Sequence, residues 1–119
     1  MPHTTPDACL FCRIARQEIP AKLIHACDDY VAFHDLNPQA PTHALIVPRR
    51  HIETLNDLTP ADAELVGGML LVARELATEL GIAEAGYRTV FNCNLAAGQS
   101  VWHVHLHLLG GREMGWPPG

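Results

Sequence analysis

The stretch Trp-His-Val-His-Leu-His-Leu-Leu, residues 102–109, decides how the rest of the chain is interpreted. Three histidines alternate there with three apolar residues: His103, His105 and His107 with Val104, Leu106 and Leu108. Strict alternation is typical of a β-strand, in which every second side chain lies on the same face. The pattern therefore predicts a strand with three imidazoles on one face and a buried apolar face. A shift of register by one residue would bury the histidines instead.

The loop before this strand, residues 97–100, reads Ala-Gly-Gln-Ser. Successive backbone N–H groups in such a turn can form a concave anion site. Histidines beside an anion site indicate phosphate chemistry, because imidazole changes its charge near neutral pH. The alternative is that the histidines are only the polar face of a half-solvated strand. Three histidines in five positions, in a chain that has eight, favour the functional interpretation.

Length and composition limit the class of protein. A chain of 119 residues predicts one domain, residues 1–119. The net charge is −5, and the only cationic pair is Arg49-Arg50, which argues against a nucleic acid polymer as partner. No apolar run is long enough to span a membrane, and the N-terminus lacks a signal segment. We therefore expect no membrane contact, a cytoplasmic location and four reduced cysteines.

The remaining elements follow from local patterns. Strands are expected at residues 22–26, 30–36, 42–48 and 87–94, in addition to 102–109. A short helix is expected at 8–17, a helical turn at 52–57 and a long helix from 60 to 80. The ends are expected to be a flexible tail at 1–7 and an extended tail at 112–119, in which Trp116 packs on another surface, such as a partner chain. Five strands with one long helix predict an α+β fold, with the last two strands antiparallel.

The long helix has clear end signals. Thr59 is the expected N-cap, Pro60 the first helical residue, and Asp62 lies three residues after the cap. Gly81 is the expected C-terminal stop. Gly67-Gly68 lies inside the helix and is unfavourable there by about 1 kcal/mol per glycine. Close packing of another backbone would compensate for this cost.

Several segments resemble one known family. The alternating triad, preceded by Gly98-Gln99-Ser100, resembles the motif of the histidine triad (HIT) family. Residues 33–36 (Phe-His-Asp-Leu), 40–43 (Ala-Pro-Thr-His) and 46–52 (Ile-Val-Pro-Arg-Arg-His-Ile) are similar to the first half of that family. The ending at 116–119, Trp-Pro-Pro-Gly, resembles its Hint branch, the nucleoside phosphoramidate hydrolases. The resemblance extends from about Asp7 to Gly119.

This resemblance implies a fold and an activity. The fold would be HIT-like, a five-stranded antiparallel sheet that joins a second copy edge to edge as a homodimer with a larger continuous sheet. A purine nucleotide, such as AMP or GMP, would bind along the histidine strand. The implied reaction is hydrolysis of the phosphorus–nitrogen bond of an adenosine 5′-phosphoramidate, which releases AMP and an amine. No cofactor is implied for catalysis.

The resemblance also assigns catalytic roles. His105, the middle histidine, would be the nucleophile that forms a nucleotidyl-histidine intermediate. His107 would contact the phosphate and help protonate the leaving amine. His43 matches a fourth histidine that orients or polarises the site, and Ser100 would stabilise charge on the phosphate.

The implied nucleotide contacts lie on several segments. Asp35 matches the acid that binds the ribose hydroxyls, while Gln99 and Ser100 would bind the phosphate. The other implied contacts are Asn92, Gly98, Val101 and, as walls for the base, Ile24, Phe33 and Leu36. Alternatives remain open for some of these: Asp35 could begin the turn at Asn37-Pro38, Asn92 could cap a strand end, and His43 could be structural. His34 is expected on the opposite strand face, with no catalytic role.

Cys9 and Cys12 have the C-x-x-C spacing of half a zinc site. The resemblance implies that His51 and His103 complete it in some family members, as a closed structural Cys₂His₂ zinc site. Other members work without metal. The alternative is a pair of reduced thiols, half-buried on the first helix.

Two rival functions remain at this stage. The chain could be a non-catalytic nucleotide-binding or scaffolding dimer. It could also be a dinucleoside polyphosphate hydrolase or a nucleotidyltransferase that uses the same histidine. The intact His105, His107 and Ser100 argue against the first rival, and the Hint-like ending argues against the second.

Overall fold

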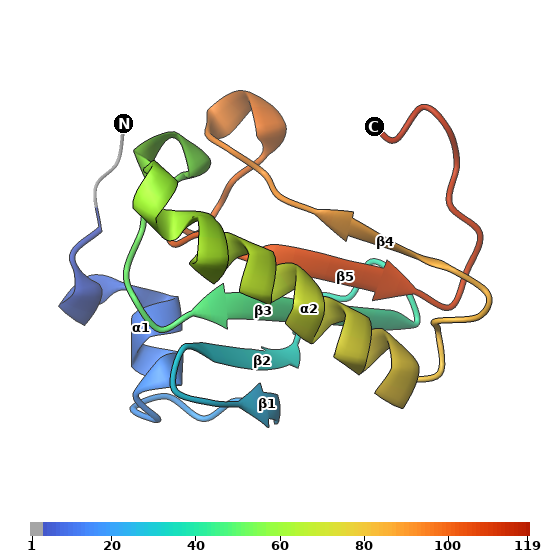
Figure 1. The fold of residues 1–119 in the computed structure, drawn as a ribbon, viewed down its shortest axis with the longest axis horizontal. Helices are drawn as coiled ribbons and strands as arrows, with labels where there is room; N and C mark the ends of the chain where they lie inside the picture. Colours follow the sequence, from blue (N-terminus) through green and yellow to red (C-terminus); the bar gives the residue numbers. More distant parts are fainter. Residues whose placement is uncertain (1–3) are drawn as a thin grey trace.

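The computed structural model describes residues 4–119. Its core is one antiparallel five-stranded sheet, with the strands in the order β1-β2-β3-β5-β4 (Figure 1). The bounds of the strands are Leu23–Ala26 (β1), Tyr30–His34 (β2), Thr42–Pro48 (β3), Tyr87–Val90 (β4) and Leu106–Gly110 (β5). The α+β prediction and the antiparallel pairing of the last two strands are confirmed.

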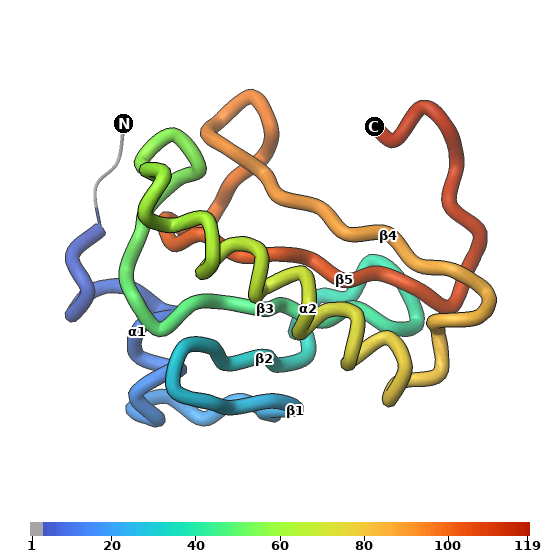
Figure 2. The backbone as a smooth tube through the Cα atoms, viewed as in Figure 1, coloured from blue at the N-terminus to red at the C-terminus, as the bar shows by residue number. Residues whose placement is uncertain are grey.

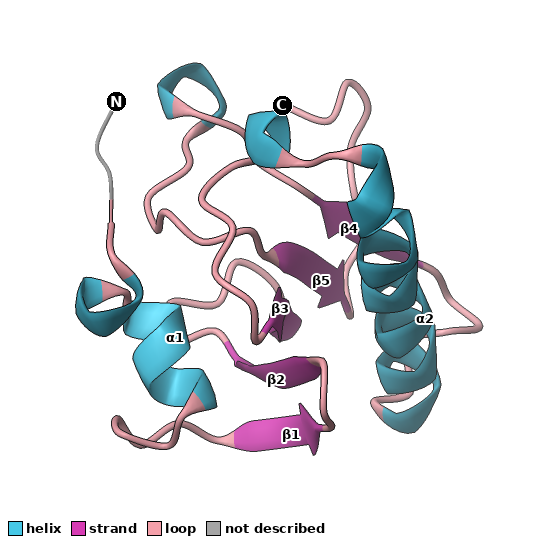
Figure 3. Ribbon diagram, turned by 60° about the vertical axis from the view of Figure 1, so that its left-hand side comes forward, coloured by secondary structure: helices cyan, strands magenta, loops and turns pink. Residues whose placement is uncertain are grey.

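Two α-helices cover opposite faces of this sheet, as Figure 3 shows. The long helix α2, Ala63–Glu79, packs on one face against β3 and β5. The short helix α1, Leu10–Ala15, lies on the other face, against Val31, Phe33, Leu45 and Val47 of β2 and β3. The sheet is therefore the middle of three layers, and its central strands are buried on both sides.

The alternation of residues 103–108 survives in three dimensions. Val104, Leu106 and Leu108 belong to the core under α2. The rings of His103 and His105 contact Phe11 of α1, and the ring of His107 contacts that of His105. The three imidazoles thus share the α1 face, as predicted. Regular β5 pairing begins only at Leu106, because the segment before it is held by loops, with Val104 N–H donating to the Ile52 carbonyl.

The expected caps of the long helix are present. Thr59 and Asp62 form a capping box around Pro60, and the first turn, Pro60–Asp62, is a 3-10 turn. Gly81 follows the helix with φ +76°. The backbone expected to pack closely on the glycine pair is absent, and a side chain takes its place at Gly68. A Cβ there would overlap the Tyr30 hydroxyl, which donates to the Leu65 carbonyl at 2.6 Å. Gly67 has no such neighbour.

The ends of the chain differ in part from the prediction. Residues 1–3 of the expected flexible tail lie outside the described part, but Pro6–Ala8 form a 3-10 turn, and Asp7 pairs with Arg16 at 3.1 Å. The last residues form no helix or strand and pass beside β4, where Arg88 donates to the Gly115 carbonyl (Figure 2). The Trp116 side chain is 84% exposed in the single chain. Within residues 4–119, no helix is long and apolar enough to cross a membrane.

Candidate active site and metal centre

A groove with a volume of about 790 Å³ opens on the α1 face of the sheet. This volume lies in the range of pockets that bind small molecules and cofactors. The strand register forms its floor: Phe33 pairs with Leu45, and Leu45 pairs with His107. Cross-strand partners lie on the same face of a sheet. The groove therefore has an apolar floor that ends in a histidine.

His105 lies at the inner end of the groove and is buried. Its Nδ1 lies 2.7 Å from the His103 carbonyl oxygen. A carbonyl can only accept, so Nδ1 carries the proton and Nε2 keeps its lone pair. Burial lowers the pKa of His105, although the His103 carbonyl and the Asp35 charge oppose the shift. The ring is therefore neutral at pH 7 and oriented as a nucleophile.

His107 and His43 form a second unit beside it. The two ring nitrogens, His107 Nδ1 and His43 Nε2, are 2.9 Å apart, and Asp35 Oδ2 lies 3.5 Å from His43 Nε2. Burial, followed by the neighbouring His105 and His43, lowers the pKa of His107 to about 4. Burial also lowers the pKa of His43, against the opposing charge of Asp35. Both rings are therefore neutral near pH 7.

Most of the predicted nucleotide contacts line this groove. They are Phe33, Asp35, Leu36, Ser100, Val101, His105 and His107. His43 lies behind His107 instead of in the lining. Asp35 begins the turn, since its Oδ1 accepts from the Asn37 N–H at 2.8 Å, and it also lines the groove. Asn92 and Gly98 are not part of the lining.

Ile24 was assigned to the wrong face of the sheet. It packs with the core under α2, whereas its neighbour Leu23 packs on the α1 side. Because side chains alternate along a strand, Ile24 cannot form a wall of a groove on the α1 face. An isoleucine of the preceding segment, Ile19, lines the groove instead.

Gln99 is part of the scaffold and does not line the groove. Its side chain is 5% exposed, donates to the carbonyls of Glu53 (2.7 Å) and Val101 (3.1 Å), and accepts from Asn94 N–H (2.8 Å). An amide with these three bonds has little capacity left for a phosphate. Gln99, expected to bind the phosphate, instead uses its side chain to hold together the loop that positions Ser100.

The expected anion nest is also closed. The N–H groups of Ala97, Gly98 and Gln99 donate to carbonyls of the same loop, those of Asn94 and Leu95. Gly98 has φ +82°, which lets the chain turn back on itself. Three successive N–H groups that are used internally cannot bind an anion, so the Ser100 side of the loop is what faces the groove.

The sequence interpretation missed the wall opposite the sheet. This wall comes from α1 and the segment after it, with Leu10, Phe11, Ile14, Ile19, Pro20, Ala21 and Lys22. Phe11 and Ile14 are buried residues of α1, but nothing in the local sequence says which strands this helix covers. His34, Pro38 and Leu45 complete the lining. Lys22 is the only lysine of the chain.

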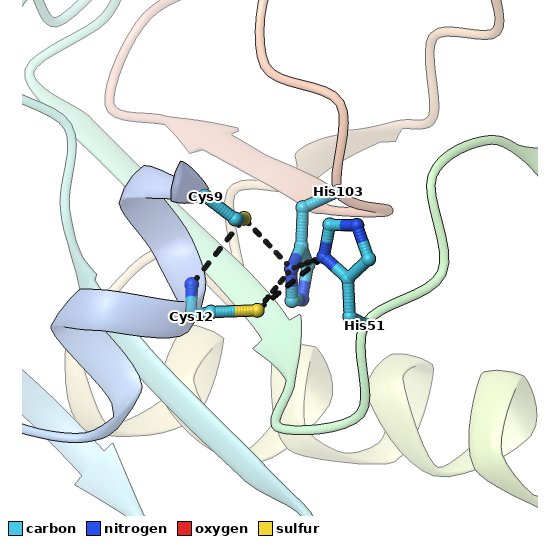
Figure 4. A group of neighbouring side chains, drawn as sticks. All are labelled: Cys9, Cys12, His51 and His103. Carbon is cyan, nitrogen blue, oxygen red and sulfur yellow. Dashed lines mark hydrogen bonds between the residues drawn. The ribbon is translucent and has the colours of Figure 1, made fainter. Parts of the chain in front are cut away.

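The first triad histidine takes part in a different cluster, shown in Figure 4. His103 Nδ1 lies 3.3 Å from Cys9 Sγ, 3.5 Å from Cys12 Sγ and 3.3 Å from His51 Nδ1. Cys12 Sγ is also 3.3 Å from His51 Nδ1. Usual zinc–sulfur and zinc–nitrogen bond lengths place tetrahedral ligand atoms about 3.3–3.8 Å apart. The four side chains therefore have the spacing of a closed Cys₂His₂ site.

Proton positions in this cluster also suit a cation. His103 is fully buried, and its Nε2 donates to the Pro48 carbonyl at 2.7 Å, so the lone pair of Nδ1 faces the thiols. Burial lowers the pKa of His103 to about 4, which keeps the ring neutral. Burial, with the neighbouring Cys9, raises the pKa of Cys12 to about 12. A bound zinc ion would displace this thiol proton.

Comparison with known proteins gives a consistent result. The HIT domain model matches residues 16–114. The purine nucleoside phosphoramidase of Escherichia coli K12 is 46% identical over 106 residues, which is 89% of each chain. A HIT-like protein of Synechocystis is 46% identical over 110 residues, 92% of this chain and 96% of that protein.

Solved structures agree in fold as well as in sequence. A HIT family hydrolase from Legionella pneumophila superimposes with a TM-score of 0.92 at 54% identity, covering 93% of this chain and 99% of that one. The triad, the sheet order and these matches lead to one conclusion: the chain belongs to the HIT domain family.

Proposed function

We propose that the protein is a purine nucleoside phosphoramidase, which hydrolyses the phosphorus–nitrogen bond of adenosine 5′-phosphoramidates. The observation that carries the proposal is His105, a neutral, buried imidazole whose Nε2 lone pair is directed by the His103 carbonyl. The activity of the E. coli relative, 46% identical over 89% of this chain, supports the same reaction.

The chemistry proceeds in two balanced steps. The lone pair of His105 Nε2 forms a bond to phosphorus while the bond from phosphorus to the leaving nitrogen breaks, and that nitrogen keeps the electron pair and takes a proton from solvent. Water then attacks the nucleotidyl-histidine: its oxygen bonds to phosphorus, the bond from phosphorus to Nε2 breaks, His105 recovers its lone pair, and one proton of the water returns to solvent. The products are a nucleoside monophosphate and an amine.

The remaining groove residues bind and orient the nucleotide. Asp35 accepts from the ribose hydroxyls, and Ser100 and His107 donate to the phosphate. The base lies between apolar side chains, with Phe33, Ile19 and the fully exposed Leu36 as its walls. Nothing in this set rejects either purine strongly, because apolar walls discriminate weakly.

The test is release of AMP from a lysine-linked adenosine phosphoramidate. Wild type should release AMP, and His105→Ala should lose roughly 10⁴-fold or more in kcat, as enzymes do when a nucleophile is removed. Release that survives the substitution would refute the mechanism. Wild type that binds AMP without turnover would support a binding or scaffolding protein, and faster turnover of a diadenosine polyphosphate would support the polyphosphate hydrolase class.

We also propose that the protein acts as a homodimer. β4 is at the edge of the sheet, and large apolar side chains are exposed on or near it and on α2: Leu70, Leu71, Tyr87 and Trp116. Exposed apolar groups of this size favour an interface. Sedimentation should give twice the chain mass. The cytoplasmic location stays a prediction from the sequence.

A structural zinc ion is the third proposal. Cys9, Cys12, His51 and His103 would hold it, with two thiolates that balance its charge. It would join α1 to the segment after β3 and to the segment before β5 without taking part in the reaction, because a closed four-ligand site leaves no open position for substrate.

A further inference from the structure

The hydrogen bonds around His43 have only one consistent direction. The main-chain nitrogen of Gln39 lies 3.0 Å from His43 Nδ1. A backbone N–H can only donate, so Nδ1 must accept with its lone pair. His43 is buried, and its side chain is only 3% exposed. A neutral ring that accepts at Nδ1 carries its single proton on Nε2.

This proton position determines that of the next ring. His43 Nε2 lies 2.9 Å from His107 Nδ1 and 3.5 Å from Asp35 Oδ2, so the shorter contact is with the histidine. With the proton on His43 Nε2, His107 Nδ1 must accept. The single proton of neutral His107 is then on its own Nε2, the nitrogen that is left for a ligand in the groove.

We propose that the main-chain N–H of Gln39 is a positioning group, which sets a one-way chain of hydrogen bonds from Gln39 to His43 to His107. His107 therefore meets the substrate as an Nε2–H donor. The consequence for catalysis rests on the proposed function, whereas the direction of the hydrogen bonds does not.

The hydrogen bonds at Nδ1 give His105 and His107 opposite groups at Nε2. His105 donates through Nδ1 to the His103 carbonyl and presents a lone pair at Nε2. His107, two residues later, accepts at Nδ1 and presents an N–H at Nε2. Two carbonyl-bonded histidines would both present lone pairs to an anionic phosphate, which would be unfavourable. The different partners at Nδ1 give one nucleophile and one hydrogen-bond donor.

The same series of hydrogen bonds excludes His43 as the source of the proton that leaves with the amine. A proton source must be able to give up a proton and be recharged from behind. Behind His43 is a peptide N–H, which does not release its proton in neutral water. His43 is therefore a fixed donor that orients His107, and it does not supply the proton that leaves with the amine.

The loop around Gln39 is suited to hold this N–H in place. The Gln39 side chain donates to the Asn37 carbonyl at 3.0 Å, and Asp35 accepts from the Asn37 N–H at 2.8 Å. Arg112 donates to the Gln39 carbonyl at 3.1 Å. Two of these contacts, at the Asn37 N–H and at the Gln39 carbonyl, hold the main chain on both sides of the Gln39 N–H and do not depend on the Gln39 side chain.

The direct test is nitrogen-15 NMR of the full-length protein near neutral pH, which distinguishes protonated from unprotonated ring nitrogens. We expect Nε2–H rings for His43 and His107 and an Nδ1–H ring for His105. An Nδ1–H ring at His43 or His107 would overturn the proposal. This readout is independent of turnover, so absent phosphoramidase activity with the expected ring protons would refute only the proposed function.

A matched pair of variants tests the effect on catalysis. Gln39→Pro removes the N–H and keeps the carbonyl that Arg112 binds, whereas Gln39→Ala keeps the N–H and removes only the side chain. We expect Gln39→Ala to keep the ring protons and kcat of wild type. Gln39→Pro should mix the two His43 ring forms and lower kcat about 10-fold, the factor that one hydrogen bond contributes, with AMP affinity nearly unchanged.

The two variants distinguish a role of the Gln39 N–H from a role of the Gln39 side chain. A Gln39→Pro protein with wild-type ring protons and wild-type kcat would overturn the role of the N–H. An equal loss of kcat in both variants would overturn it as well, because the side chain would then be responsible. If Gln39→Pro does not fold, the ring protons of wild type still decide the question.

Discussion

Two clusters on one face of the sheet each combine two histidines with other possible metal ligands, but they differ in what they can bind. The first cluster consists of Cys9, Cys12, His51 and His103, and the second of Asp35, His43 and His107. In each cluster, the possible ligand atoms all lie within 4.8 Å of one another. In the first cluster, the lone pair of His103 points inward, because its other nitrogen is bonded to Pro48.

In the second cluster, both nitrogens of His43 and the Nδ1 of His107 are already used in hydrogen bonds. His43 accepts from Gln39 at one nitrogen and faces His107 with the other. A metal ion there would have to break one of these hydrogen bonds. Proximity alone therefore does not make a metal site. The position of the proton on each imidazole decides whether the histidine can bind a cation or orients another side chain.

The largest expected effect comes from breaking the first cluster. Cys12→Ser should abolish zinc binding and lower the free energy of unfolding by several kcal/mol, because the binding energy of a structural zinc is folding energy. Elemental analysis and denaturant unfolding measure both effects. Cys27→Ser, which alters an exposed cysteine outside the cluster, is the control. Full zinc content in Cys12→Ser, or metal-free wild type purified without chelator, would contradict the proposed site.

Breaking the second cluster should affect turnover instead. His107→Asn removes the donor beside the nucleophile, so kcat should fall roughly 10²- to 10⁴-fold, the usual effect of losing a catalytic acid or donor. Zinc content should stay close to wild type, and AMP binding should fall much less than kcat, because only one of the phosphate donors is lost. Steady-state kinetics and isothermal titration with AMP measure these properties. Loss of zinc in this variant would show that the two clusters are not independent.

The pH dependence of stability sharpens the contrast. The pKa of His107 is near 6.5 in the unfolded chain and lowered to about 4 in the fold, mainly by burial. Between these values the unfolded chain binds more protons, so the contribution of His107 is complete above 6.5 and is lost as the pH falls toward 4. Unfolding at about pH 7 and about pH 5 should show a smaller loss for His107→Asn than for wild type. Equal losses would place the pKa of His107 at its ordinary value.

The smallest effect is expected for Asp35→Asn, which removes the carboxylate of the second cluster and should not change the metal content. Asp35→Asn should leave one zinc ion per chain, because the lone pairs beside Asp35 are already bonded. The same variant should raise KM for the phosphoramidate, since an amide accepts less strongly from the ribose hydroxyls. A second metal ion in wild type that Asp35→Asn loses would show that the second cluster also binds metal.

Sequence patterns predicted the parts of the fold that depend on local chemistry. The alternation at residues 103–108, the cap at Thr59 and the strand Thr42–Pro48 depend on neighbours in sequence, and all three are present. The long strand predicted at 87–94 ends at Val90, because the loop that carries Asn94 turns away with φ +68°. The Gln99 side chain holds this turn, because its Oε1 accepts a hydrogen bond from the Asn94 N–H.

The alternation predicted that the three histidines share one face, and the resemblance supplied the other residues of the site. His105, His107, Asp35 and Ser100 line the groove as expected. Ile24 and Gln99 do not, because the face of an edge strand and the direction of a buried amide depend on which helix covers the sheet. The position of α1 is a tertiary property, and no local pattern in Phe11 or Ile14 encodes it.

The single lysine of the chain has a practical consequence. Lys22 lines the groove, and every other cationic side chain in the sequence is an arginine. An amine-reactive fluorophore would therefore attach at only one side chain, at the mouth of the groove. A dye placed there would respond directly to nucleotide entry, so occupancy could be followed in real time without a coupled assay or a modified substrate.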